Sequence, residues 1–197
     1  MDKLYMILLC LMIVPILICI KYSRKIKSDV ASSIVKCLIF AIVTILSNGL
    51  SAFSGNETFS YIMEALYRFS FDLMLIYVLQ YSQQYTRVFH EVSPFKKGCF
   101  IIAYLDGILL FLNIIFHNVF TIETVRFPNF DMYHVADKSI IFYFHYVFAY
   151  GLVVCIIASF IIKIIQIPDF YRKKYLPILV LICVITVSKF ICGISEF

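Results

Sequence analysis

The stretch from 139 to 162 reads SIIFYFHYVFAYGLVVCIIASFII and contains no Asp, Glu, Lys or Arg. The hydrocarbon core of a bilayer, about 30 Å thick, is crossed by roughly 20 helical residues at about 1.5 Å each. This stretch therefore predicts a membrane-crossing helix. Similar apolar runs, each long enough for a span, lie at 4–20, 30–53, 59–81, 98–120 and 176–194.

The composition points to the same environment. The chain is 62% hydrophobic and only 15% charged, whereas a water-soluble domain is nearer half apolar and a quarter charged. The first run is followed by a basic segment, 21–27, and not by a small-residue cleavage site, so it is interpreted as a retained span. We expect an all-α, polytopic transmembrane helix bundle that forms one domain over 1–197. Its immediate partner is the lipid bilayer.

Lys and Arg counts predict the orientation. The first, third and fifth connections hold eleven of these residues, and the opposite side holds three. The positive-inside rule then places the N-terminus outside. Because the basic residues lie in short loops between apolar runs, we interpret the net charge of +5 as a feature of membrane topology and not of nucleic-acid binding. Six spans would leave the C-terminus outside as well, so we expect a seventh span that returns the chain to the cytoplasm.

The outer connection 121–138 has the pattern of a β-hairpin. It alternates in TIETVRF, turns at Pro128 and Asn129, and continues through 132–135. Alternation on both sides of a turn signal is typical of two paired strands. A short hairpin over the outer helix ends is therefore expected.

Ionisable residues inside spans are functional candidates, because burying them in lipid is costly. Counting helical rise from the inner span ends puts one group in the inner half of the membrane, where it forms a candidate intramembrane ion pair: Lys36 with Asp72 or Asp106. A second group falls in the outer half: Glu64, Arg68, Asn113, His117, His145 and Lys189. The outer group forms either a small-molecule pocket or a structural network that fixes helix register.

Helical spacing groups several of these residues on common faces. Glu64, Arg68 and Asp72 are four residues apart and form one polar stripe. Asp106, Asn113 and His117 fall near one face of the next helix.

No catalytic constellation is apparent. HExxH, GxSxG, P-loop and GxGxxG motifs are all missing from the sequence. The seven cysteines lie in apolar runs without a CxxC motif, which favours packing roles over a disulfide frame or a zinc site. We expect no catalytic residues, no metal and no cofactor in this segment.

Three stretches carry a family resemblance: YRFSFDLMLIYVLQYSQQY at 67–85, LDGILLFLN at 105–113 and KIIQIPDFYRKKYLP at 163–177. Together they resemble the N-terminal seven-helix membrane sensor regions that precede GGDEF (diguanylate cyclase) domains in clostridial-type bacteria. Related regions precede some histidine kinases. Asp72, Asp106 and Asn113 match recurrent polar positions of these regions.

The resemblance implies a sensory input module at the cell membrane, whose last helix leads into a cytoplasmic output domain. It implies that an unknown small-molecule or membrane-borne signal controls cyclic di-GMP synthesis by that domain, and that the full-length protein forms a dimer. Two alternatives remain open: the input region of a histidine kinase, and a fragment of a small-molecule transporter. A transporter would predict matching Gly/Pro breaks in the two halves of the chain. Pro15, inside the first run, has no later counterpart.

Overall fold

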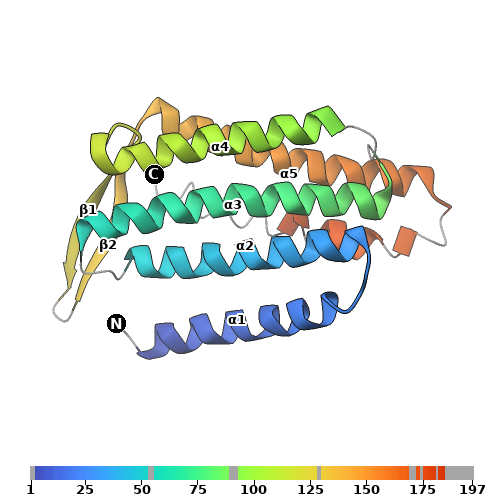
Figure 1. Cartoon of the computed structure of the whole chain (residues 1–197), viewed down its shortest axis with the longest axis horizontal. Helices are drawn as coiled ribbons and strands as arrows, with labels where there is room; N and C mark the ends of the chain where they lie inside the picture. Colours follow the sequence, from blue (N-terminus) through green and yellow to red (C-terminus); the bar gives the residue numbers. More distant parts are fainter. Residues whose placement is uncertain are drawn as a thin grey trace.

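The computed structural model describes residues 3–52, 56–88, 93–127, 130–168, 172–173, 175–180 and 182–184. This part of the chain is mostly helical (Figure 1). Its elements are, in order, α1 Lys3–Ser23, α2 Asp29–Ala52, α3 Glu57–Thr86, α4 Ser93–Phe116, β1 Phe120–Phe127, β2 Phe130–Lys138 and α5 Ile140–Gln166. Further helical residues follow at 175–180 and 182–184.

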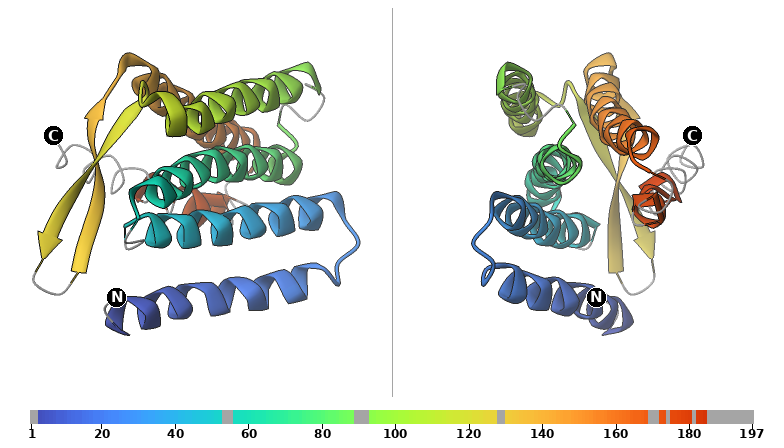
Figure 2. Two further views of the ribbon diagram at one scale, coloured as in Figure 1. Left: turned by 60° about the vertical axis from the view of Figure 1, so that its left-hand side comes forward. Right: turned by 90° about the vertical axis from the view of Figure 1, so that its right-hand side faces the viewer.

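The helices lie side by side along one axis, and α3 occupies the centre (Figures 1 and 2). α3 packs against α2, α4 and α5, while α1 packs on α2 at the edge of the bundle. A polar group on α3 is therefore surrounded by protein on several sides, whereas the outer faces of α4 and α5 have no such cover among the described residues.

These outer faces are apolar. Ile115 on α4 and Val147 and Ile165 on α5 are largely exposed, with exposed fractions of 71%, 70% and 70%. Three segments of the described chain are long and apolar enough to cross a membrane: 29–51, 94–116 and 140–166. α3 is not among them, because its middle carries Glu64, Arg68 and Asp72, which its neighbours bury.

The predicted spans correspond to helices, with one correction at a boundary. The predicted span 98–120 ends too late, because α4 stops at Phe116 and the chain enters β1 at Phe120. His117 adopts a left-handed backbone conformation with φ of 48°, which no α-helix continues. The last predicted span, 176–194, lies only partly within the described residues.

The expected hairpin is confirmed. β1 and β2 are antiparallel, with Ile122 opposite Val135 and Thr124 opposite Tyr133. Figure 2 shows the hairpin projecting at one end of the bundle, near the start of α1. The backbone N–H of Ile122 donates to the Tyr61 hydroxyl on α3 at 3.0 Å, which fastens the hairpin to the central helix. Residues 128 and 129, where the turn was predicted, lie outside the described part of the chain.

The buried apolar side chains form two clusters along the bundle axis. The hairpin-side cluster consists of Tyr61, Ala65, Leu110, Val119, Phe120 and Phe142. The distal cluster consists of Leu73, Leu75, Ile76, Leu79, Cys99, Ala103, Ala149, Leu152, Ile156 and Phe160. Both clusters draw residues from α3, α4 and α5, so the interval between them is also enclosed by these three helices.

Candidate functional site

The polar stripe predicted on α3 is buried along its whole length. Glu64 and Arg68 are each 7% exposed, and Asp72 is fully buried. Their spacing of four residues keeps all three on one helix face, and that face is directed into the bundle. The stripe has two parts, an ion pair toward the hairpin and a carboxylate deeper along the helix.

Glu64 and Arg68 form the ion pair, within one turn of α3. The Ser51 hydroxyl of α2 donates to the second Glu64 oxygen at 3.2 Å. The guanidinium carbon of Arg68 lies 4.2 Å from the ring centre of Phe142 on α5, close enough for a cation–π interaction. The Arg68 Nε atom is buried without a hydrogen-bond partner among the described residues. The pair is neutral as a unit, which is how a buried charge is tolerated.

The deeper part of the stripe meets residues of two other helices. Asp72 of α3, Asp106 of α4 and His145 of α5 are all buried, at 0%, 2% and 3% exposure. His145 Nδ1 lies 2.7 Å from Asp106 Oδ2 and 3.3 Å from Asp72 Oδ2. We call these residues the triad.

The two aspartates of the triad are in different situations. The contact between His145 Nδ1 and Asp106 is a hydrogen bond. Asp72 lies near the same nitrogen, yet neither of its carboxylate oxygens has a hydrogen-bond partner in the described part of the chain, and both are shielded from solvent. A buried carboxylate without a donor is uncommon, because nothing replaces the water that solvated it.

The triad occupies the interval between the two apolar clusters. On α4, Asp106 lies between Ala103 of the distal cluster and Leu110 of the hairpin-side cluster. On α5, His145 lies between Phe142 of the hairpin-side cluster and Ala149 of the distal cluster. Apolar layers therefore flank the triad on both sides along the bundle axis.

Gly107 explains how α4 comes close enough to α3. A Cβ atom at this position would lie 2.5 Å from the Phe69 ring, well inside van der Waals contact. The Phe69 ring also packs against Phe111, with ring centres 6.2 Å apart. A residue without a side chain, next to Asp106, thus allows the approach that brings the α4 carboxylate to α3.

Two of the predicted outer-half residues, Asn113 and His117, lie near the end of α4 and outside the triad. Asn113 is fully buried, and its amide holds the chain that enters β1: Oδ1 accepts from the backbone N–H of Val119 at 2.6 Å, and Nδ2 donates to the Phe120 carbonyl at 2.9 Å. His117 is exposed beyond the end of α4, with its ring 4.5 Å from that of Tyr61. Neither residue joins the triad, and Lys189 lies outside the described residues.

The predicted ion pair of Lys36 with Asp72 or Asp106 requires a correction. Within the described chain, Lys36 forms no ion pair with Asp72 or Asp106; its side chain is exposed, and Nζ lies 5.6 Å from the Tyr77 ring centre. His145 contacts both carboxylates instead. The depth count placed His145 in the other half of the membrane because it assumed that all spans end at the same level. Measured from the hairpin end of each helix, His145 lies about 8 Å along α5 and Asp72 about 22 Å along α3. The helix ends are therefore staggered.

The triad is the one group of three His, Cys, Asp or Glu residues among the described residues whose ligand atoms could hold a metal ion together. Alternatively, the triad can share protons, because an imidazole between two carboxylates can exchange a proton with either of them. Comparison of the chain with protein-family models, with curated proteins and with solved structures found no match.

Proposed function

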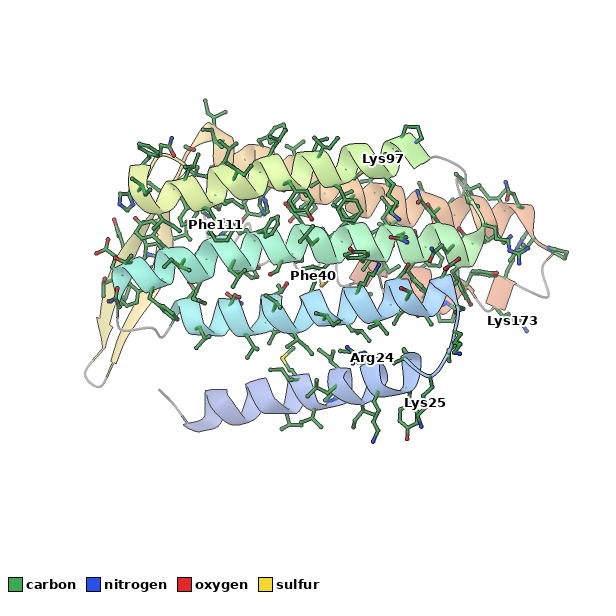
Figure 3. All side chains as sticks on the ribbon, viewed as in Figure 1. Arg24, Lys25, Phe40, Lys97, Phe111 and Lys173 are labelled. Atoms are coloured by element: carbon green, nitrogen blue, oxygen red, sulfur yellow. The ribbon has the colours of Figure 1, made fainter. Side chains whose placement is uncertain are left out.

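We propose that the chain is the membrane-embedded sensory input module of a bacterial signalling protein, crossing the cell membrane several times with its N-terminus outside. Three helices of sufficient length and apolar character support the membrane location. Basic residues support the orientation: Arg24, Lys25, Lys97 and Lys173 lie toward the end of the bundle away from the hairpin (Figure 3). By the positive-inside rule that end faces the cytoplasm, and the hairpin faces outward.

One observation carries the proposal: the α3 stripe shares polar contacts with three other helices, α2, α4 and α5. Ser51 of α2 binds Glu64, while Asp106 of α4 and His145 of α5 gather at Asp72. Protonation, ligation or displacement of any member changes the forces on several helices at once. A signal that binds two packings of the bundle with different affinity would shift the equilibrium between them, which is the requirement for transmission.

We assign the output from the resemblance described above. A diguanylate cyclase domain on the cytoplasmic side would convert the change in helix packing into cyclic di-GMP synthesis. The input region of a histidine kinase is the closest alternative, since the same helices would then control phosphorylation. Under either output, this segment contributes no catalytic residue.

A transporter is the second candidate, because of the triad. Buried carboxylates and imidazoles in membrane bundles often mark proton or ion pathways. Transport would require the triad to open alternately to the two sides of the membrane. A signalling role requires no such opening, so the two candidates differ in a measurable flux.

The test uses the full-length protein encoded by the gene, produced in cells and purified. Asp106→Asn should abolish cyclic di-GMP synthesis or hold it at a constant rate that no longer responds to the stimulus, while the protein still accumulates in the membrane. Ser70→Ala is the matched control, because it removes another buried polar contact of α3, the 3.0 Å hydrogen bond with Thr44. Normal regulation in Asp106→Asn, or proton or cation flux into liposomes that Asp106→Asn eliminates, would contradict the signalling proposal.

A further inference from the structure

We propose that Asp72, Asp106 and His145 bind one divalent transition-metal ion of the zinc class, which links α3, α4 and α5. The proposal concerns binding alone and is independent of the output domain. It contradicts the expectation from sequence that the segment holds no metal. The ligand atoms, one imidazole nitrogen and two carboxylate oxygens, all lie within 4.8 Å of one another.

The distances suit a small ion. Zinc bonds to imidazole nitrogen and carboxylate oxygen at about 2.0–2.2 Å, so ligand atoms in a tetrahedral arrangement lie roughly 3.3 Å apart. Nδ1 of His145 is already 3.3 Å from the Asp72 oxygen and 2.7 Å from the Asp106 oxygen. The second distance must widen by about half an ångström to reach that spacing, and the two carboxylate oxygens, which lie within 4.8 Å of each other, must settle at the same spacing.

The Asp72 carboxylate, which has no hydrogen-bond partner among the described residues, is the independent observation that points to a ligand. Both of its oxygens are buried and accept no hydrogen bond from a described residue, and His145 Nδ1 is engaged with Asp106. A cation at the centre of the triad would bond to this carboxylate directly, whereas the described side chains offer it only the His145 nitrogen, at 3.3 Å and shared with Asp106.

Charge balance favours a doubly charged ion. Two carboxylates and a neutral imidazole carry a net charge of −2, which a divalent cation cancels within apolar surroundings. The nearby Glu64–Arg68 pair is neutral as a unit and contributes no further net charge. A monovalent ion would leave one negative charge buried, which costs free energy in a low-dielectric interior.

The donor set selects the class of ion. Calcium takes six to eight oxygen ligands and magnesium keeps an octahedral shell rich in water, whereas imidazole with carboxylate suits zinc and neighbouring divalent transition metals. The triad offers three protein donors in the described part of the chain. Three protein ligands leave a fourth tetrahedral position open, as in sites that accept water or an exogenous donor.

The experiment uses the full chain, purified in detergent, stripped with a strong chelator and titrated with Zn²⁺. We expect one zinc per chain. Asp72→Asn, Asp106→Asn and His145→Gln should each weaken binding by more than the roughly 10–100-fold typical of losing an outer-shell partner. Glu123→Gln and His117→Ala, which alter an exposed carboxylate and an exposed imidazole outside the triad, should bind zinc as the unchanged chain does.

X-ray absorption of the zinc-loaded wild-type chain provides a readout that does not depend on the variants folding. It should show one imidazole and oxygen donors without sulfur. Sulfur ligation would assign the metal to cysteines and overturn the proposal. So would the absence of a stoichiometric zinc ion in the wild-type chain, or zinc binding that survives all three triad substitutions.

Discussion

Replacing Arg68 by Met should be among the most damaging single substitutions in the bundle. The change leaves the Glu64 carboxylate buried, with the Ser51 hydroxyl at 3.2 Å as its remaining donor among the described residues. Breaking a buried ion pair by removing one partner costs about 3–5 kcal/mol, because the other charge stays desolvated. The lost contact with Phe142, at 4.2 Å from the ring centre, is included in that figure.

The double variant Glu64→Gln/Arg68→Met should recover much of this loss. The amide oxygen introduced at position 64 would still accept the Ser51 hydrogen bond, and no charge would remain in the pair. We expect Glu64→Gln alone to cost about 1–3 kcal/mol, as for a buried polar group that loses a charged partner. The double variant should then be more stable than the sum of the single losses by about 2 kcal/mol, within the range of coupled neighbours.

The assay is a double-mutant cycle by equilibrium unfolding in mixed detergent micelles. Ser33→Ala, combined with Arg68→Met, is the control pair. Ser33 donates to Gln84 at 2.8 Å, and Gln84 lies sixteen residues, about 24 Å, along α3 from Arg68. Its effect should add to that of Arg68→Met. Additivity of Glu64→Gln and Arg68→Met within about 0.5 kcal/mol would refute the reasoning, since a real pair must couple.

Three further substitutions test the packing. Gly107→Ala should destabilise the bundle by about 1–3 kcal/mol, because the new methyl group meets the Phe69 ring. Gly151→Ala, in the interior of α5 with open space for the methyl group, should be neutral or stabilise by up to about 1 kcal/mol, and equal effects of the two substitutions in unfolding experiments would refute this. Asn113→Ala should cost about 1–3 kcal/mol and increase hydrogen exchange in β1, since it removes the bonds to Val119 and Phe120; unchanged exchange would contradict the anchoring role. Lys36→Met should change stability by no more than about 0.5 kcal/mol, as for an exposed side chain. A large loss of stability would instead support the predicted ion pair of Lys36 with Asp72 or Asp106.

Most of the helices could be predicted because each apolar run is long and contains few charges. The hairpin could be predicted from alternation around Pro128 and Asn129. The end of the fourth span could not, since Val119 and Phe120 continue the apolar run beyond His117 and Asn118. The α4 helix ends there through the Asn113 side chain and the left-handed backbone of His117, which hydropathy does not record.

The members of the candidate site were all visible in the sequence, yet their grouping was not. The polar stripe of Glu64, Arg68 and Asp72 follows from helical spacing alone, because all three residues are on one helix. The association of His145 with Asp72 and Asp106 depends on the stagger of three helices, which counting residues from assumed membrane boundaries cannot supply. Gly107, next to Asp106, was the available signal for a close helix approach.

The most direct test of the account is whether the bundle crosses the membrane with its hairpin outside. Single cysteines at Glu123 of β1 and at Lys25 and Lys97, all exposed positions, would be treated in intact cells with a membrane-impermeant maleimide. The unsubstituted chain provides the background from its native cysteines. The account predicts labelling of the Glu123 probe in intact cells, and of the Lys25 and Lys97 probes only after the membrane is permeabilised. Labelling of either lysine position from outside, or protection of the Glu123 position until permeabilisation, would contradict it.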